Sequence, residues 1–114
     1  MAAMNLWANY VKERYGWDTI VIESGFITYD LKIPECSIEE FYVEPDQRGG
    51  TLAKRLADEV FRIAEKEGCK RVWARIIPGT PGAEQAMRSN LHYGFKLFSS
   101  QGNAILLVKT IGGD

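Results

Sequence analysis

The fold is decided by residues 43–56, which read VEPDQRGGTLAKRL. An extended run is followed by a turn with the paired glycines Gly49 and Gly50, and an amphipathic helix begins directly afterwards. At such a helix start, several backbone N–H groups have no acceptor within the helix, and the positive end of the helix dipole lies behind them. This geometry suits a diphosphate group, to which Arg48 adds a positive charge and the Thr51 hydroxyl a further donor.

The rest of the chain alternates between strand and helix patterns. Residues 19–23 and 26–33 predict two strands joined by a tight turn at Ser24 and Gly25, hence an antiparallel hairpin. Thr80 is the expected N-cap of the last helix. Further strands are expected over 38–43, 71–77, 95–98 and 104–109, and helices over 4–15, 51–67 and 81–93. This order predicts one α/β domain, spanning residues 1–114, with a mixed sheet covered by helices.

Composition narrows the class of protein. The 114 residues are 46% apolar and carry a formal net charge of −1, which argues against neutralising nucleic-acid phosphates as the main activity. No apolar run approaches the length of about 20 residues that spans a bilayer, and the N-terminus does not resemble a secretory signal. Cys36, Cys69 and the single histidine, His92, match no metal-binding spacing. We therefore expect a cytoplasmic protein with two reduced thiols and no metal.

Two common phosphate-binding motifs are excluded. The P-loop string G-x-x-x-x-G-K-[ST] does not occur, and Gly49-Gly50 does not supply the dinucleotide fingerprint G-x-G-x-x-G. Residues 43–53 instead resemble the acetyl-CoA-binding motif of the GNAT (Gcn5-related N-acetyltransferase) family, a strand ending in V-x-P followed by R-G-x-G-x-[GA] and a helix. The positions of Val43, Pro45, Arg48, Gly49 and Ala53 match, whereas Thr51 stands where the family usually has its second glycine.

The resemblance covers residues 19–109 and includes the pair Gly94-Phe95, which in the family ends a helix before the next strand. The upstream part is shorter than in the family, with one helix where two are common and no first strand. The resemblance implies a GNAT-like fold in which the two central parallel strands, here 38–43 and 71–77, splay apart around the pantetheine arm of acetyl-CoA. Backbone amides near Phe41 to Val43 would then face the thioester carbonyl and stabilise its developing negative charge.

Two catalytic helpers are implied by the family's direct transfer to an amine. GNAT enzymes often place a glutamate base on the strand that holds Glu39 and Glu40, and we favour Glu39, which in a regular strand shares a face with Phe41 and Val43. Both glutamates also fit a role as solvated charges. The family's tyrosine acid, four residues before the Gly-Phe pair, is replaced by Asn90.

Tyr93 is the alternative acid, and it equally fits a helix-end aromatic packed on Phe95.

Arg75 lies in an apolar strand, where an arginine usually needs a partner. We expect it either to contact the cofactor or acceptor or to form an ion pair at the end of the sheet. The implied cofactor contacts are Phe41, Tyr42, Val43, Arg48, Gly49, Gly50, Thr51, Leu52, Ala53, Lys54 and Asn90.

The resemblance implies an N-acetyltransferase that moves an acetyl group from acetyl-CoA (coenzyme A) to a primary amine in a ternary complex. The acceptor is a small molecule or a protein, which the sequence does not identify. The short N-terminal part leaves the acceptor side open, which suits a bulky acceptor or a homodimer partner that closes the site. The alternative is a GNAT-fold module without catalysis that binds acyl-CoA or serves as a structural or interaction component. Neither nucleic acid nor a membrane is an expected partner.

Overall fold

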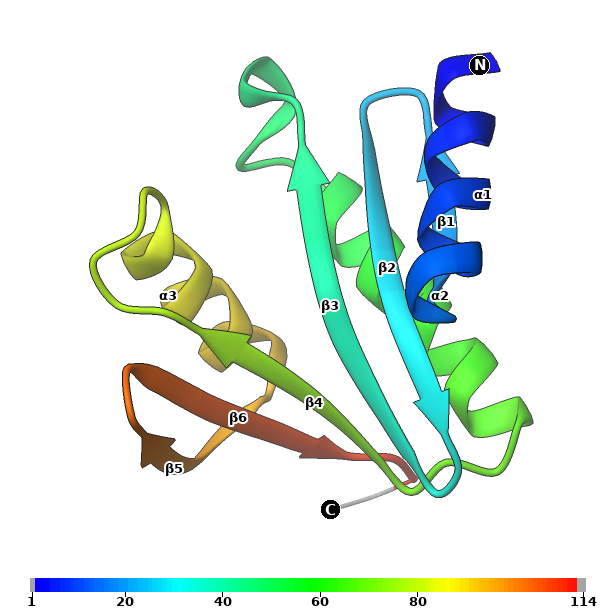
Figure 1. Ribbon diagram of the computed structural model, residues 1–114. Coiled ribbons are helices and arrows are strands. Elements are labelled where there is room, and N and C mark those ends of the chain that lie inside the picture. The colour runs from blue at the N-terminus through cyan, green and yellow to red at the C-terminus, as the bar shows by residue number, and fades with distance from the viewer. Residues whose placement is uncertain (1, 113–114) are drawn as a thin grey trace.

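The computed structural model describes residues 2–112 and contains one six-stranded sheet with helices on both faces (Figure 1). The predicted order of helices and strands is confirmed. Along the sheet the strands lie in the order β1-β2-β3-β4-β6-β5. The elements are α1 (Ala2–Tyr15), β1 (Asp18–Ile22), β2 (Gly25–Lys32), β3 (Glu35–Val43), the 3-10 turn η1 (Pro45–Gln47), α2 (Leu52–Lys66), β4 (Arg71–Ile76), α3 (Ala83–Tyr93), β5 (Lys96–Gln101) and β6 (Ala104–Thr110).

The first half of the sheet is an antiparallel meander of β1, β2 and β3. The predicted hairpin between β1 and β2 is present, and its last pair joins Ile22 to Gly25. A Cβ atom at Gly25 would collide with the carbonyl oxygen of Tyr42 on β3, so only glycine allows the three strands to approach this closely. The turn thereby sets the position of the end of β3, where the loop that leads to α2 begins.

The two central strands separate after a short parallel contact. β3 and β4 pair only from Glu35 with Arg71 to Ser37 with Trp73, and then diverge toward their carboxyl ends (Figure 1). The other strand pairs are antiparallel and run over most of the strand lengths. Beyond Ser37, the edge of β3 that faces β4 therefore has no strand partner within residues 2–112. This confirms the splay that the family resemblance implied.

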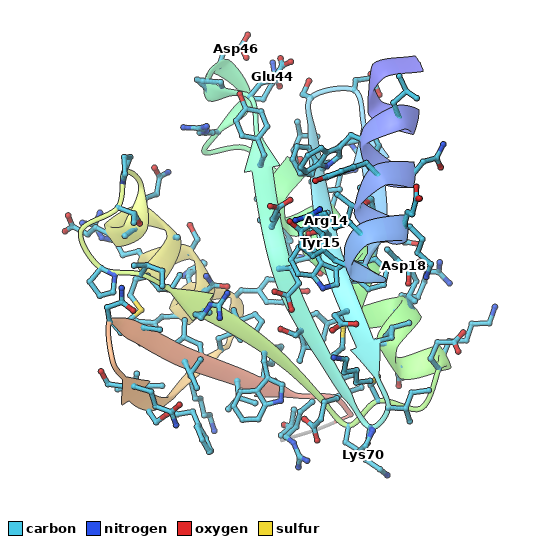
Figure 2. The ribbon with its side chains drawn as sticks, in the orientation of Figure 1. Arg14, Tyr15, Asp18, Glu44, Asp46 and Lys70 are labelled. Carbon is cyan, nitrogen blue, oxygen red and sulfur yellow. The ribbon has the colours of Figure 1, made fainter. Side chains whose placement is uncertain are left out.

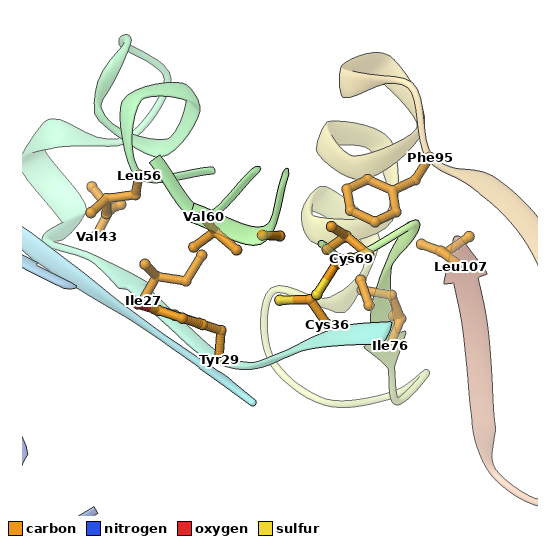
Figure 3. Packing of buried hydrophobic residues seen from close by; sticks show 13 residues of the cluster. Ile27, Tyr29, Cys36, Val43, Leu56, Val60, Cys69, Ile76, Phe95 and Leu107 are labelled. Atoms are coloured by element: carbon orange, nitrogen blue, oxygen red, sulfur yellow. The ribbon is translucent and has the colours of Figure 1, made fainter. Parts of the chain in front are cut away.

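One face of the sheet holds the main core. The apolar stripe of α2, which includes the buried residues Leu56, Val60 and Ala64, packs on Ile27 and Val43 of the sheet (Figure 3). Phe95 and Leu107 extend the same cluster under α3. The buried stripe agrees with the period of the sequence, so α2 has a single orientation on β2 and β3. That orientation directs the N-terminus of α2 at the end of β3.

The opposite face is only partly covered. α1 lies across β1 and β2, where Val11 is completely buried (Figure 1). Trp7 of α1 packs on Phe26 with ring centroids 6.0 Å apart, and Phe26 stacks on Tyr42 of β3 at 5.9 Å. No helix of the described chain covers β4, β6 and β5 on this face. Among residues 2–112, no helix combines the length and apolar character needed to cross a membrane.

Several predicted boundaries differ from the structure: β3, for example, begins at Glu35 and not at residue 38. Thr80 is not the N-cap of α3, because its hydroxyl donates to the Ile77 carbonyl oxygen at 2.7 Å within a preceding turn, and Gly82 holds the cap position with a φ of 81°. The loop predicted over 99–103 is shorter, since β5 continues to Gln101. Polar residues on an edge strand resemble a loop in sequence, because nothing needs to bury them.

An ion pair closes the narrow end of the splay. The Glu35 carboxylate accepts hydrogen bonds from the Arg71 guanidinium and, at 2.6 Å, from the Trp73 indole N–H. The bond from Arg71 chiefly lowers the pKa of Glu35 from its ordinary value of 4.5; burial opposes this shift, while the bond from Trp73 adds to it. Because its folded-state pKa is lowered, the Glu35 carboxylate stabilises the fold fully at pH values above 4.5. This contribution is lost as the pH falls through the folded-state pKa.

We therefore expect Glu35→Gln to reduce the free energy of unfolding by about 1 kcal/mol near neutral pH, since the pair is partly exposed and solvent screens it. Urea titrations from neutral to acidic pH should show the difference from wild type shrinking as the pH drops below about 4.5. Glu84→Gln is the matched control, because Glu84 also pairs with an arginine but its side chain is 85% exposed. An equal loss in the two variants, or a loss that does not depend on pH, would contradict this account.

Candidate active site

The loop between β3 and α2 is held by its own backbone. After Val43, the Gln47 N–H donates to the Glu44 carbonyl oxygen at 2.9 Å and closes the turn η1. Gly49 then adopts a φ of 85°, a left-handed conformation that favours glycine. Figure 2 shows Glu44 and Asp46 at the outer tip of this loop, where both side chains are exposed. The acidic groups of the segment thus project away from the helix start.

The helix start presents a series of free donors. Within residues 2–112, no acceptor is present for the backbone N–H groups of residues 49–54. The first internal bond, from the Arg55 N–H to the Thr51 carbonyl oxygen, is 2.9 Å long. Gly49, Gly50, Thr51, Ala53 and Lys54 are all exposed, and Leu52 is half-buried. A group of exposed amides at the positive end of a helix is the geometry that binds an anionic oxygen cluster.

Arg48 stiffens this group of amides. Its Nε donates to the Val43 carbonyl oxygen at 2.7 Å, and its guanidinium carbon lies 5.6 Å from the centre of the Tyr42 ring. The side chain therefore ties the loop back to the last residues of β3. The remaining guanidinium N–H groups form no hydrogen bond or ion pair with the described chain, which leaves a positive charge available beside the free amides.

A β-bulge interrupts β3 halfway along the splay. Ile38 pairs with Tyr29 and Glu40 with Thr28, so Glu39 is an extra residue without a partner in β2. Because cross-strand partners share a face, Phe41, opposite Ile27, points to the core side, and Glu40 points to the α1 side. The bulge interrupts the regular alternation behind the expected common face of Glu39, Phe41 and Val43, so that common face stays a prediction. The Glu39 side chain is half-buried, whereas Glu40 is exposed.

Glu39 lines a hollow of about 100 Å³ at the point where β3 and β4 part. Its other walls are Ser37 and Ile38 of β3, Trp73, Ala74 and Arg75 of β4, and Leu106 of β6. The hollow begins at the last parallel pair, Ser37 with Trp73. A carboxylate thus stands beside the opening between the two strands, with the free amides at the far end of β3.

The sequence matches a family model described as acetyltransferase (GNAT) family over residues 11–93, which is most of the chain. This chain belongs to the GNAT acetyltransferase family. Its activity class is therefore acetyl transfer, and acetyl-CoA is the acetyl donor that the family uses. Among curated proteins, no significant sequence match was found.

Solved structures share the GNAT fold at low sequence identity. The PaiA N-acetyltransferase from Thermoplasma acidophilum in complex with coenzyme A is 17% identical, with a TM-score of 0.75 over 94% of this chain and 70% of that chain. An aminoglycoside 6'-N-acetyltransferase complexed with coenzyme A is 14% identical, with a TM-score of 0.71 over 92% of this chain and 78% of that chain. An acetyltransferase of the GNAT family from Staphylococcus aureus Mu50 is 13% identical, with a TM-score of 0.72 over 91% and 75%.

The departure from the GNAT motif at Thr51 costs no backbone strain. Thr51 has a φ of −99°, which any residue adopts, so glycine is not required there for conformation. Its hydroxyl makes no hydrogen bond to the helix start and is exposed. Lys54, another predicted cofactor contact, donates to Asp58 at 2.8 Å. Of the groups in this loop, the Arg48 guanidinium and the backbone amides are thus the donors that could bind an anion without first breaking another contact.

Tyr93 lies apart from the splayed strands of this GNAT domain. Its hydroxyl donates to the Asp58 carboxylate of α2 at 2.6 Å, and its ring packs 5.5 Å from Phe61. Burial and the bond to Asp58 raise the pKa of the Tyr93 hydroxyl above its ordinary value. Asn90, the residue at the family's tyrosine position, is half-buried and donates to the Ala86 carbonyl oxygen at 2.8 Å within α3. The Tyr93 side chain is thus engaged with α2, and the Asn90 amide with its own helix.

A larger hollow of about 520 Å³ lies elsewhere, between α2 and the end of β6. Its walls include Asp58, Arg62, Glu65 and Lys109, and none of its lining residues belongs to the loop or to β3 and β4. Size alone therefore does not mark the active site of this GNAT domain. The smaller hollow is the one that adjoins the splay.

Sequence reasoning left the role of Arg75 open and did not single out Leu106. Arg75 is exposed and forms no ion pair within the described chain, whereas the ion pair at the end of the sheet is made by Arg71. In the sequence, apolar Val72 and Ala74 alternate with Arg75, a signal that places Arg75 on the face of the sheet opposite the core; Val72 and Ala74 are buried and Arg75 is exposed. Nothing in the sequence signals that Leu106 is its cross-strand neighbour.

Proposed function

We propose that this GNAT domain binds acetyl-CoA with its diphosphate on the amides of residues 49–54 and transfers the acetyl group to a primary amine at the hollow between β3 and β4. The observation that supports this proposal is the series of free, exposed amides at one end of two strands that part after Ser37. Arg48 lies beside those amides and adds a charge that a diphosphate would neutralise. The unpaired edge of β3 is available to an extended pantetheine arm, which would lie along it as an added strand.

Acetyl-CoA supplies an activated acetyl group, whose C–S bond breaks as the amine nitrogen forms a bond to the carbonyl carbon. In our proposal Glu39 accepts the proton that the ammonium nucleophile must lose. Backbone amides of Phe41 to Val43 on the free edge of β3 donate to the carbonyl oxygen, which gains negative charge. The bond between Tyr93 and Asp58 occupies the Tyr93 hydroxyl, so we propose that the thiolate leaves without a dedicated acid, with Tyr93 as acid only if that bond opens. The thiolate takes up a proton from solvent, and solvent receives the second proton that the nitrogen loses as the amide forms.

Arg48→Ala should weaken acetyl-CoA binding by about tenfold or more, because a charge-assisted contact contributes roughly 1.5–3 kcal/mol. Isothermal titration calorimetry of the variant and of wild type measures the change. Arg62→Ala is the matched control, since Arg62 is an exposed α2 arginine paired with Glu59 and distant from the loop. Unchanged affinity in Arg48→Ala would show that the diphosphate is held elsewhere.

Release of free thiol from acetyl-CoA across a panel of amines tests the transferase step. We expect amine-dependent release in wild type above the rate of spontaneous hydrolysis. Cofactor binding without release on any amine would contradict the transfer to a primary amine and favour a module that only binds acyl-CoA. A thermal shift by acetyl-CoA is the accompanying binding control, since a ligand at a hundredfold excess over its Kd stabilises the fold by about 2.7 kcal/mol.

A further inference from the structure

Two opposite charges line the hollow between β3 and β4 without neutralising each other. Glu39 stands on the β3 side and Arg75 on the β4 side. Neither takes part in the ion pairs or side-chain hydrogen bonds formed within residues 2–112. A half-buried carboxylate that faces a guanidinium across a small space usually pairs with it when the backbone permits.

The backbone keeps the two groups apart. β3 and β4 are hydrogen-bonded only as far as Ser37 and Trp73, two residues before each charged residue, and they diverge beyond this point. Four residues earlier in each strand the situation is reversed, because Glu35 and Arg71 lie where β3 and β4 are paired and their side chains meet. The walls of the hollow therefore contain a negative and a positive side chain that do not pair with each other.

The remaining walls are mostly apolar. Trp73 and Leu106 line the hollow, and Phe98 meets the Trp73 ring edge-on with centroids 4.9 Å apart. Phe98 is 59% exposed on a face of the sheet that no described helix covers. A volume of about 100 Å³ corresponds to roughly three water molecules, which is the size of a charged head group and not of a larger ligand. A bound molecule would extend from the head-group site onto Trp73 and Phe98.

We propose that the acceptor is an aminocarboxylate with an apolar side chain, bound with its amine at Glu39 and its carboxylate at Arg75. This inference rests on the proposed function, since it names the acceptor of the same site. A ligand that carries both charges complements both groups at once, whereas a simple amine leaves the guanidinium without an anion. The apolar side chain lies against Trp73 and Phe98. Arg75 is a specificity-determining residue in this arrangement, and it does not take part in the chemical step.

Binding is tested on the protein saturated with coenzyme A, by 15N–1H NMR titration with three probes: L-phenylalanine, 2-phenylethylamine and 3-phenylpropionate. We expect L-phenylalanine to bind at least about tenfold more tightly than either singly charged analogue, which corresponds to one charge-assisted contact. Shifts should concentrate at residues 37–39 and 73–75. Arg75→Gln should remove the preference for L-phenylalanine over 2-phenylethylamine, while Arg88→Gln, an exposed α3 arginine paired with Glu84, should retain it.

Equal affinity for L-phenylalanine and 2-phenylethylamine, or an Arg75→Gln variant with an unchanged preference, would overturn the proposal. The same probes in the thiol-release assay separate the two ideas. Efficient acetylation of 2-phenylethylamine with no gain from the carboxylate overturns the aminocarboxylate site and leaves the transferase function standing. Selective binding of L-phenylalanine at residues 37–39 and 73–75 without any thiol release supports the site and contradicts the transferase function.

Discussion

Replacing Glu39 with glutamine is expected to lower kcat/KM for acetyl transfer by about 10²- to 10³-fold, in the range of a lost general base. Glutamine keeps the size and polarity of the side chain, so the bulge and the hollow should persist, but an amide cannot accept the proton of an ammonium group. Binding of acetyl-CoA should be unchanged, because the free amides of residues 49–54 lie beyond the other end of the strand. Steady-state kinetics together with calorimetry measures both quantities.

Glu40→Gln is the control for this prediction, since Glu40 is the next residue, is exposed and points to the α1 side. Its kcat/KM should stay within about threefold of wild type, as for a surface substitution. The defect of Glu39→Gln should also shrink at alkaline pH, where a larger share of an amine with an ordinary pKa of about 10 is already deprotonated. A larger loss of kcat/KM in Glu40→Gln than in Glu39→Gln would show that Glu39 is not the base.

Leu56→Ala is expected to lower the free energy of unfolding by about 3 kcal/mol, and the melting temperature by about 12 °C. Leu56 is 1% exposed and packs beside Val43, where α2 meets the end of β3 (Figure 3). The substitution leaves a cavity at the contact that aligns the helix start with the strand. Because this contact sets the direction of the amides, acetyl-CoA affinity should fall together with stability.

Leu97→Ala is the matched control, because the Leu97 side chain is 63% exposed on the edge strand β5. Its removal should change the free energy of unfolding by less than about 0.5 kcal/mol. Urea denaturation followed by circular dichroism gives both values. If Leu56→Ala unfolded at the same urea concentration as Leu97→Ala, the packing of α2 on β3 would not be a main source of stability.

The fold was largely predictable because its strongest patterns are local. The spacing of Leu56, Val60 and Ala64 predicts α2 and its buried face, and the turn at Ser24-Gly25 predicts the first hairpin. Helix and strand periods differ, so apolar spacing distinguishes the two over such lengths. The start of α3 was wrong at Thr80, where prolines and glycines allow several turn arrangements with similar local preference.

The parts of the candidate site that depend on local backbone conformation were predictable from the sequence. The parts that depend on which residues pair across strands were less predictable. The free amides follow from a turn with two glycines directly before a helix. The bulge at Glu39 does not follow, because the sequence of β3 keeps a regular appearance and the extra residue is defined only by its partners in β2. The presence of Arg75 and Glu39 in the walls of one hollow depends in turn on the parallel register of β3 and β4, which no local pattern specifies.

Titration of 15N-labelled protein with coenzyme A measures the central claim directly, because each backbone amide reports its own hydrogen bond. We expect the largest downfield proton shifts at residues 49–54, with saturation at the stoichiometry of one ligand per chain, and smaller shifts along residues 38–43 of β3. Largest shifts around Asp58, Arg62 and Lys109, at the hollow between α2 and β6, with residues 49–54 unmoved, would contradict the account.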